Sequence, residues 1–246
     1  MKIYSRPAQI ADEDDVATIG RFRSGHSRLG EPTALDDWRV TTGDPEVADK
    51  IFEVYGGEAP QSWETTQEDN LEVFTASPEV EIIIANSKAL RQRMVLWSRQ
   101  GKLVIDSDGE TYADGTPDPD AELTFAERKK KGQDGLGPAP QIEVYFRLAE
   151  EPDLGVFKYQ TGSWSMVQDL VRDQTVEALE EIDGPALATL KIEEVSFVAK
   201  NGPRAGETIT YKKPVLTIAR RWDPVVHLAL QRIRDLDAAA DRAGVS

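Results

Sequence analysis

The segment best suited to chemistry is an acidic stretch at 106–122, which reads DSDGETYADGTPDPDAE. It holds seven carboxylates and no Lys or Arg, and its Gly and Pro residues indicate a loop. Calcium prefers oxygen ligands, and an EF-hand loop needs them at positions 1, 3 and 5, with Gly at 6 and a carboxylate at 12. Counted from Asp106, position 6 is Thr111 and position 12 is Pro117. The pattern fails, and a solvated acidic loop is favoured over an adventitious divalent site.

The other reactive residue types are too few or too isolated to form a catalytic group. The chain has no Cys, and its two histidines, His26 and His227, lie at opposite ends. The run GRFRSGHSRLG at 20–30 lacks the Gly-Lys-Ser/Thr ending of a phosphate loop and reads as a turn-rich connector. A hydrolase-type carboxylate pair stays open, although nothing singles out two of the 44 acidic residues. We expect no catalytic residue, no metal ligand and no cofactor.

The charge balance separates the classes of partner. The 246 residues carry 44 acidic and 29 basic side chains, for a formal net charge of −15. Nucleic-acid binding depends on Lys and Arg that neutralise phosphates, so this balance favours a basic protein partner over DNA or RNA. The basic cluster at 128–131 is flanked by acidic residues and indicates a salt-bridging turn. Without an apolar leader or a run of membrane-spanning length, the chain is expected to be cytoplasmic.

Hydrophobic periodicity predicts hairpin-like strand pairs with inserted helices. We therefore expect an α+β fold with a mostly antiparallel or mixed sheet and a C-terminal helix. The firmest element is a helix over 45–55, which Asp44-Pro45 starts and Gly56-Gly57 ends. Further helices are predicted at 87–97, at 163–182 and from 224 onward. Strands are predicted at 36–42, 63–75, 80–85, 102–106, 141–148 and 154–160, and on both sides of the turn NGPRAG, where Pro214 indicates an edge or a bulge.

Composition also divides the chain. An acidic N-terminal tail (1–19) precedes an N-terminal α+β region (20–106). An acidic, loop-rich insertion (107–140) then separates it from a C-terminal α+β region (141–246). The sequence leaves open whether the two α+β regions form one continuous domain.

A series of short segments resembles the recombination directionality factors of actinophages, the accessory proteins of large serine integrases. The resemblance spans roughly residues 20–170, and the order and spacing of the segments carry it, because no single segment is specific. The segments are GRFRSG (20–25), ALDDWRVTT (34–42), VYGG (54–57), Trp63, LWSRQGKLVIDSDGE (96–110) and EVYFRLAEEPDLGVFKYQTGS (143–163).

The resemblance implies a regulator and not an enzyme. Such a factor binds its integrase on the attachment-site DNA, promotes excision (attL × attR) and inhibits integration (attP × attB). It acts through protein–protein contacts with little or no direct DNA binding, since the integrase supplies the catalytic serine and the DNA contacts. Many sequences of this kind carry several cysteines in the region matching 101–135. None is present here, so the implied zinc site does not carry over. A DNA-binding recombination or replication accessory protein is the alternative.

Two surfaces are candidates for contact with the partner. Exposed members of the N-terminal region form the first, because Arg and aromatic side chains are common at the centre of interfaces. The apolar face of the last helix forms the second and would dock on a coiled coil of the partner. For Trp38 and Tyr55 the competing interpretation is core packing, and for the helix it is packing on its own domain. The candidate contact residues are Arg21, Arg23, Trp38, Arg39, Tyr55, Val226, Leu230 and Ile233.

Overall fold

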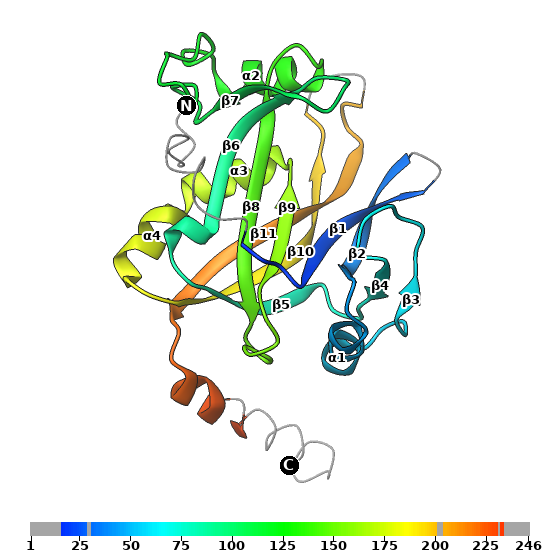
Figure 1. Cartoon of the computed structure of the whole chain (residues 1–246). Coiled ribbons are helices and arrows are strands. Elements are labelled where there is room, and N and C mark those ends of the chain that lie inside the picture. The colour runs from blue at the N-terminus through cyan, green and yellow to red at the C-terminus, as the bar shows by residue number, and fades with distance from the viewer. Residues whose placement is uncertain (1–15, 29–30, 201–203, 231, 234–246) are drawn as a thin grey trace.

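Runs of alternating apolar and polar residues assemble into a mixed sheet of eleven strands with helices α1 to α4 and a further helical segment at 224–230, which confirms the α+β expectation (Figure 1). The computed structural model describes residues 16–28, 31–200, 204–230 and 232–233. The expected acidic tail therefore lies, up to residue 15, outside the described residues.

The strands are β1 (Gly20–Arg28), β2 (Glu31–Thr42), β3 (Gln61–Ser62), β4 (Leu71–Phe74), β5 (Glu79–Ile84), β6 (Leu90–Trp97), β7 (Leu103–Ser107), β8 (Ala139–Leu148), β9 (Phe157–Thr161), β10 (Ala186–Val198) and β11 (Thr208–Arg221). The helices are α1 (Pro45–Tyr55), α2 (Phe125–Gln133), α3 (Trp164–Arg172) and α4 (Thr175–Ile182), and η2 (Ser87–Ala89) is a single 3₁₀ turn.

The strand order is β11-β10-β5-β8-β9-β1-β2-β4-β3, and β6 and β7 attach through β8. Among the pairings between these strands, β1 with β9 is parallel and the others are antiparallel. Strands of the N-terminal region and strands of the C-terminal region thus belong to one sheet, with β5 lying between β10 and β8. The helix α1 packs on β2 and β4, whereas α3 and α4 pack on β11.

The N-terminal unit forms as its local signals predict. The side chain of Asp44 accepts a hydrogen bond from the backbone N–H of Glu46 (2.9 Å), and Pro45 occupies the first turn of α1. Gly56 and Gly57 have φ angles of 61° and 94°, a region that favours glycine, and there the helix ends. Its buried face, Val47 with Ala48 and Ile51, then packs on the strands that flank it.

Aromatic side chains hold the N-terminal and later strands together. Trp38 on β2 is fully buried, and its ring meets Tyr159 on β9 edge-on, with centroids 5.1 Å apart. Phe22 on β1 contacts Phe146 and Phe157 in the same geometry, each at 5.4 Å. Such edge-to-face contacts stabilise a pair by about 0.5–1.5 kcal/mol beyond the burial of area. These contacts join β1 and β2 to β8 and β9 in one continuous hydrophobic core.

Two N-terminal expectations were wrong. Residues 20–28 form strand β1 and not a turn-rich connector. The strand pairs with both β2 and β9, and its residue Phe22 is buried in the core. Residues 90–97 form strand β6 and not a helix. Leu90 and Met94 suit either period, but the buried residue between them is the polar Gln92, which hides the period of two that the strand follows.

Three further predictions need correction in detail. The run 163–182 begins at the predicted Ser163 cap but breaks into α3 and α4, because Gln174 adopts a left-handed conformation with φ of 50°. The basic turn at 127–132 is helix α2, which Thr124 and Glu127 start with a reciprocal capping box. Of the strand expected at 63–75, only the end forms, as β4.

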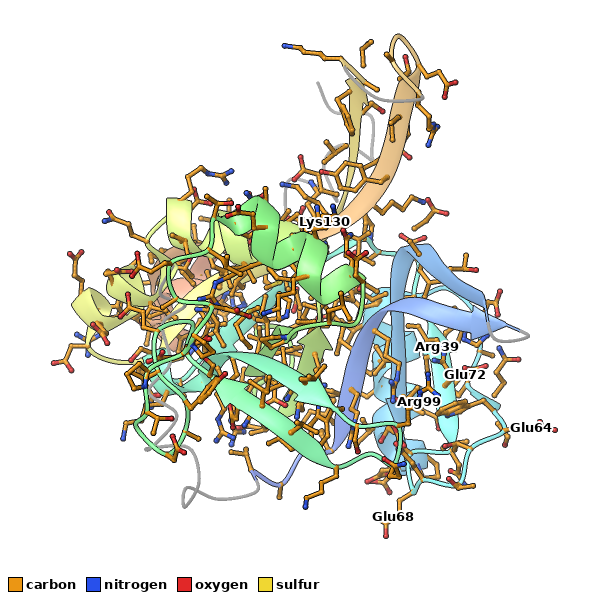
Figure 2. All side chains as sticks on the ribbon, turned by 90° about the horizontal axis from the view of Figure 1, so that it is seen from above. Arg39, Glu64, Glu68, Glu72, Arg99 and Lys130 are labelled. Carbon is orange, nitrogen blue, oxygen red and sulfur yellow. The ribbon has the colours of Figure 1, made fainter. Side chains whose placement is uncertain are left out.

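The β10–β11 pair forms a long hairpin whose far end rises from the rest of the molecule (Figure 2). Phe197, Val198 and Tyr211 lie on this projecting part and are exposed. Strand β11 stands at the end of the strand order, which agrees with the edge position expected for Pro214. Residues 201–203 of the expected NGPRAG turn lie outside the described residues. No helix in the described part of the chain is long and apolar enough to cross a membrane.

Candidate partner-binding surfaces

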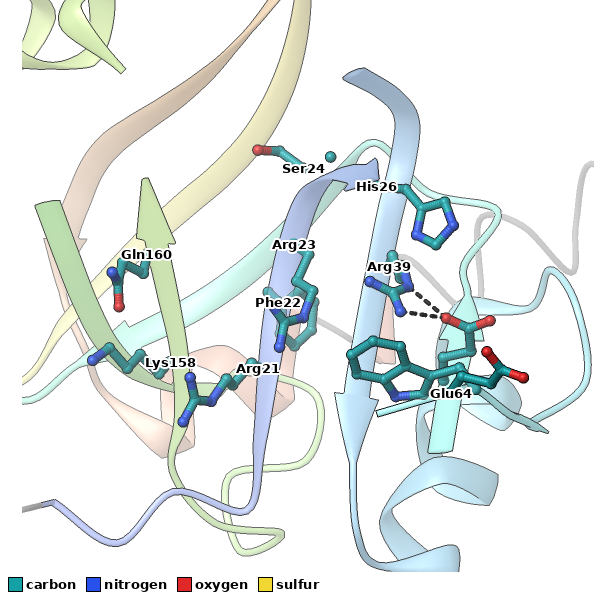
Figure 3. A pocket seen from close by; sticks show the side chains of 12 residues that line it. Arg21, Phe22, Arg23, Ser24, His26, Arg39, Glu64, Lys158 and Gln160 are labelled. Carbon is teal, nitrogen blue, oxygen red and sulfur yellow. Dashed lines mark hydrogen bonds and ion pairs between the residues drawn. The ribbon is translucent and has the colours of Figure 1, made fainter. Parts of the chain in front are cut away.

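A pocket of about 770 Å³ opens on the polar face of the sheet, over β1, β2 and β9 (Figure 3). Alternate residues of these strands point away from the core, which brings Arg21 and Arg23 from β1, Arg39 from β2 and Lys158 from β9 to one wall. Trp63, from the segment between β3 and β4, lines the pocket beside Arg39. The pocket is therefore rich in cations, although the chain as a whole is acidic.

Arg39 is held rigidly at the base of the pocket. Its guanidinium pairs with Glu72 on β4, whose Oε2 lies 2.6 Å from Nε and 2.5 Å from Nη2. The same guanidinium stacks over the indole of Trp63, 4.5 Å from the ring centroid. Arg39 is 3% exposed. It therefore contributes to the electrostatic potential and the shape of the pocket but offers little surface for contact with a ligand.

Arg23 is half-buried beside Arg39. Its Nη2 donates to Asp69 at 3.2 Å and its Nε donates to the hydroxyl of Thr41 at 3.1 Å. Burial lowers the pKa of the Arg23 guanidinium, and the neighbouring Arg39 and Arg21 lower it further against the opposite effect of Asp69. Removal from water is the largest of these effects, and the repulsion by the two neighbouring guanidinium groups adds to it.

The other cations of the pocket differ in how they are compensated. Lys158 donates to Glu143 on β8 at 2.7 Å. Arg21 is exposed, and within the part of the chain that the structure describes it forms no ion pair. Glu64 also lines the pocket and is exposed. Arg21 is therefore the cation of this wall that is most available to a ligand.

The two aromatic candidates differ in burial. Trp38 has no exposed area and cannot contact a partner in this conformation, which agrees with the competing core interpretation. Tyr55 is half-buried at the end of α1, where its hydroxyl donates to Glu150 at 3.0 Å. Burial and the nearby carboxylate of Glu150 raise the pKa of this phenol. Of the N-terminal candidates, Arg21 and Arg23 are those that the structure places at an accessible pocket.

The last helix begins after Asp223, whose carboxylate accepts hydrogen bonds from the amides of Val225 and Val226. The chain is helical over 224–230, and this segment projects beyond the end of β11 (Figure 1). The candidate residues Val226, Leu230 and Ile233 are 43, 42 and 53% exposed. Their spacing of four and three puts them on one helix face. These side chains are exposed, as contact with a partner would require, and the contact itself stays a prediction. Residues 231 and 234–246 lie outside the described residues.

Hydrogen bonds and a buried ion pair hold the acidic segment at 106–122, so it is not freely solvated along its length. Asp118 is buried and accepts hydrogen bonds from the hydroxyl of Ser107 (2.7 Å) and the amide of Asp120 (2.8 Å). Arg128, from helix α2, reaches into the loop, pairs with Asp118 at 3.4 Å and donates to the carbonyl of Gly109 at 2.7 Å. A buried ion pair therefore holds the loop in this chain.

In the described residues no group of three or more His, Cys, Asp or Glu is placed so that it could hold a metal ion. Asp118 and Asp108 instead bond to hydroxyl and amide groups of the loop itself.

Sequence reasoning missed Lys158 and Trp63 as site residues. The alternation of β9 puts Lys158 on the polar face. Lys158 lies beside Arg21 because β9 pairs in parallel with β1, and no local sequence pattern predicts that pairing. It also missed the exposed pair Phe197 and Tyr211, whose rings meet edge-on at 6.2 Å on the projecting hairpin. In the register of the hairpin Phe197 lies opposite Ile209 and Tyr211 opposite Val195, so the two rings are diagonal neighbours across the strands.

The fold and surfaces define an α+β protein with a cationic pocket, an exposed helix face and a projecting hairpin, all suited to contacts with another macromolecule. A family model described as "Gp3-like: Recombination directionality factor-like" matches residues 19–219, which is most of the chain. The chain therefore belongs to this recombination directionality factor-like family, and membership supports a role in the control of recombination. No solved structure matches the chain.

Proposed function

We propose that this protein is the directionality factor of a phage large serine integrase. It binds the integrase on attachment-site DNA, promotes recombination between the left and right prophage sites (attL × attR) and inhibits the integrative pairing (attP × attB). The observation that carries the proposal is the family match over residues 19–219. The order of the segments over residues 20–170, which resembles the actinophage factors, supports a large serine integrase as the partner.

The proposed activity requires differential binding and no chemistry by this chain. A ligand shifts an equilibrium between two integrase assemblies only if it binds one better than the other. Moving such an equilibrium from 1:99 to 99:1 needs about 5.5 kcal/mol of differential binding free energy. A surface with a few well-packed apolar and Arg contacts can provide that amount, since truncation of a single hot-spot residue costs about 2 kcal/mol or more.

The apolar face of the last helix is our proposed contact with a coiled coil of the integrase. Val226, Leu230 and Ile233 repeat at the four-and-three spacing of a coiled-coil seam and are exposed in the free protein. A helix face of this kind is buried when a partner helix packs against it. The net charge of −15 supports contact with a basic, DNA-bound protein over contact with the DNA itself.

An in vitro recombination assay with the matching integrase tests the proposal. The protein should stimulate recombination of attL × attR substrates and reduce attP × attB recombination. The double variant Val226→Asp with Leu230→Asp should lose both effects, because it puts two charges into the proposed seam. Leu228 lies on the same helix with 56% exposure and, at 100° per residue, points away from that seam. Leu228→Asp is therefore the matched control and should retain activity.

If the wild-type protein leaves both reactions unchanged, the proposed function fails. If Leu228→Asp loses as much activity as the double variant, the seam is not the contact. The alternative is a DNA-binding accessory protein, and the cationic pocket is the feature that favours it. A gel shift of attachment-site DNA by the protein alone at physiological salt would support that alternative. A supershift that needs integrase would support the proposal.

A further inference from the structure

The cationic pocket places like charges opposite each other on neighbouring strands, which destabilises the fold unless nearby carboxylates compensate the charges. In the sheet register, Arg23 on β1 lies opposite Arg39 on β2, and Arg21 lies opposite Lys158 on β9. Like charges directly opposite each other across strands are destabilising. The chain has more acidic than basic residues, 44 against 29, and yet places two such cationic pairs side by side. Local rules of this kind are broken chiefly at functional sites.

Carboxylates of the chain compensate three of the four cations. Glu72 pairs with Arg39, Asp69 with Arg23 and Glu143 with Lys158. Arg21 has no such partner within the described residues. Glu64, which also lines the pocket, is exposed to water, and no ion pair links it to the described cations. The pocket is therefore left with one uncompensated guanidinium at its open side.

The shape of the site suits a planar anion. A guanidinium offers a rigid fork of donors that matches a carboxylate with two parallel hydrogen bonds. Arg39 is already fixed by Glu72 and by its stacking on Trp63, so the wall behind Arg21 and Arg23 is ordered before any ligand arrives. Pre-ordering reduces the entropy cost of binding.

We propose that this pocket binds a carboxylate side chain from an acidic segment of the protein partner, with Arg21 as the principal donor and Arg23 beside it. The proposal deepens the proposed function and rests on it for the identity of the partner. It assigns the sheet face a contact that is separate from the helix seam.

A DNA phosphate fits the surroundings less well. Duplex DNA carries a negative charge about every 1.7 Å of its axis, so its binding needs a stripe of several cations. Here the segment beside the pocket carries Glu64, Glu68 and Asp69, and Figure 2 shows Glu64 and Glu68 pointing outward. A duplex laid on this face would meet these carboxylates, whereas a single acidic side chain can enter between them.

The first experiment uses a small probe and the full chain. Side-chain Nε–H signals of the arginines are followed by NMR during titration with N-acetyl-glutamic acid amide, and separately with its neutral glutamine analogue. We expect saturable shifts of the Arg21 and Arg23 signals with the glutamate probe only. Arg21→Gln should abolish the response of Arg23. The matched control, Lys130→Gln, removes an exposed cation of helix α2 and should leave the response intact.

Three results would overturn the proposal. The first is the absence of a saturable shift. The second is an equal response to both probes, since that would exclude recognition of the charge. The third is a response to attachment-site duplex at lower concentration than to the glutamate probe, because the ligand would then be a nucleic acid. Arg21 is exposed, so its replacement should not impair folding, and thermal unfolding of each variant verifies this.

The second experiment measures the complex with DNA-bound integrase. Arg21→Glu should weaken binding at least tenfold, whereas Lys130→Glu, with the same change of charge, should change it less than twofold. Equal binding by Arg21→Glu and wild type would overturn the inference and leave the proposed function intact. If wild type binds no integrase, the proposed function fails, and the glutamate titration still decides whether the pocket binds a carboxylate.

Discussion

The buried ion pair between Asp118 and Arg128 should hold the acidic loop, and breaking it from either side should be costly. The Asp118 and Arg128 side chains are 1 and 4% exposed, so removal of one partner leaves the other charge buried and uncompensated. Such a loss costs about 3–5 kcal/mol. Arg128→Met leaves Asp118 with the hydrogen bonds from Ser107 and Asp120, and we expect the lower end of this range. Asp118→Asn leaves the guanidinium with the carbonyl of Gly109, and we expect the upper end.

Urea denaturation gives the free energy of unfolding for each variant, and hydrogen exchange at the amides of Gly109 and Asp120 reports local opening of the loop. These amides donate to Ser107 and Asp118 respectively, so their protection depends on the same network. The double variant should cost less than the sum of the single variants, by about 0.5–3 kcal/mol, because the two side chains interact directly. Single variants that cost under about 1 kcal/mol in both measurements would refute the reasoning.

The same pair predicts how stability depends on pH. Burial alone would raise the pKa of Asp118, but the Ser107 hydroxyl, the Asp120 amide and the Arg128 guanidinium outweigh it and hold the pKa below its usual range. A carboxyl whose pKa is lower in the folded state stabilises the fold above its unfolded pKa of about 3.9. That contribution is lost as the pH falls toward the folded pKa. Asp118→Asn should therefore flatten this part of the stability profile between about pH 5 and pH 2.

Three further predictions concern the fold. Gly57→Ala should cost about 2 kcal/mol or more of unfolding free energy in a urea titration, because φ is 94° and a Cβ would lie 2.0 Å from a backbone oxygen of β4. Gly115 has open space around it, so Gly115→Ala should cost less in the same titration. Trp38→Ala should cost about 3–5 kcal/mol by urea denaturation, and Trp97→Ala, at 50% exposure, less than about 1 kcal/mol. Burial raises the pKa of Tyr55, as it does those of Tyr112 and Tyr159, so a spectrophotometric titration should show phenols that stay protonated beyond pH 10. Tyr55→Phe should show one fewer of these phenols and should weaken the loss of stability above about pH 10.

Local signals of the sequence were sufficient where one element depends on its own residues. The cap at Asp44 and the glycines at 56–57 fixed α1 on both sides, since each acts on backbone groups within a few residues. The same kind of signal was present at Thr124 and Glu127 and predicts α2, although the charge of the run 127–132 drew the interpretation toward a turn. Strand β6 was obscured because Gln92 occupies a buried position that a strand normally fills with an apolar residue.

The candidate site could not be predicted to the same extent, because it depends on long-range pairing. Arg21 and Arg23 were selected as candidates from residue type and position in the sequence, and both line the pocket. Their alignment with Lys158 and Arg39 follows from the register of β1 with β9 and with β2. A single sequence contains no local pattern that encodes such a register. The separation of Trp38 from the surface likewise depends on Phe22 and Tyr159, which come from other strands.

The parallel pairing of β1 with β9 has a consequence for how the chain acquires its structure. During synthesis the first strand emerges long before the strand that begins at residue 157, and until then Phe22 and Trp38 lack the rings of Phe157 and Tyr159 that cover them. Contacts between such distant segments make folding slow and leave apolar surface open on the way. Fragments that stop before residue 157 should therefore aggregate or bind chaperones. Deletion mapping of the partner surface is best replaced by point substitutions in the full chain.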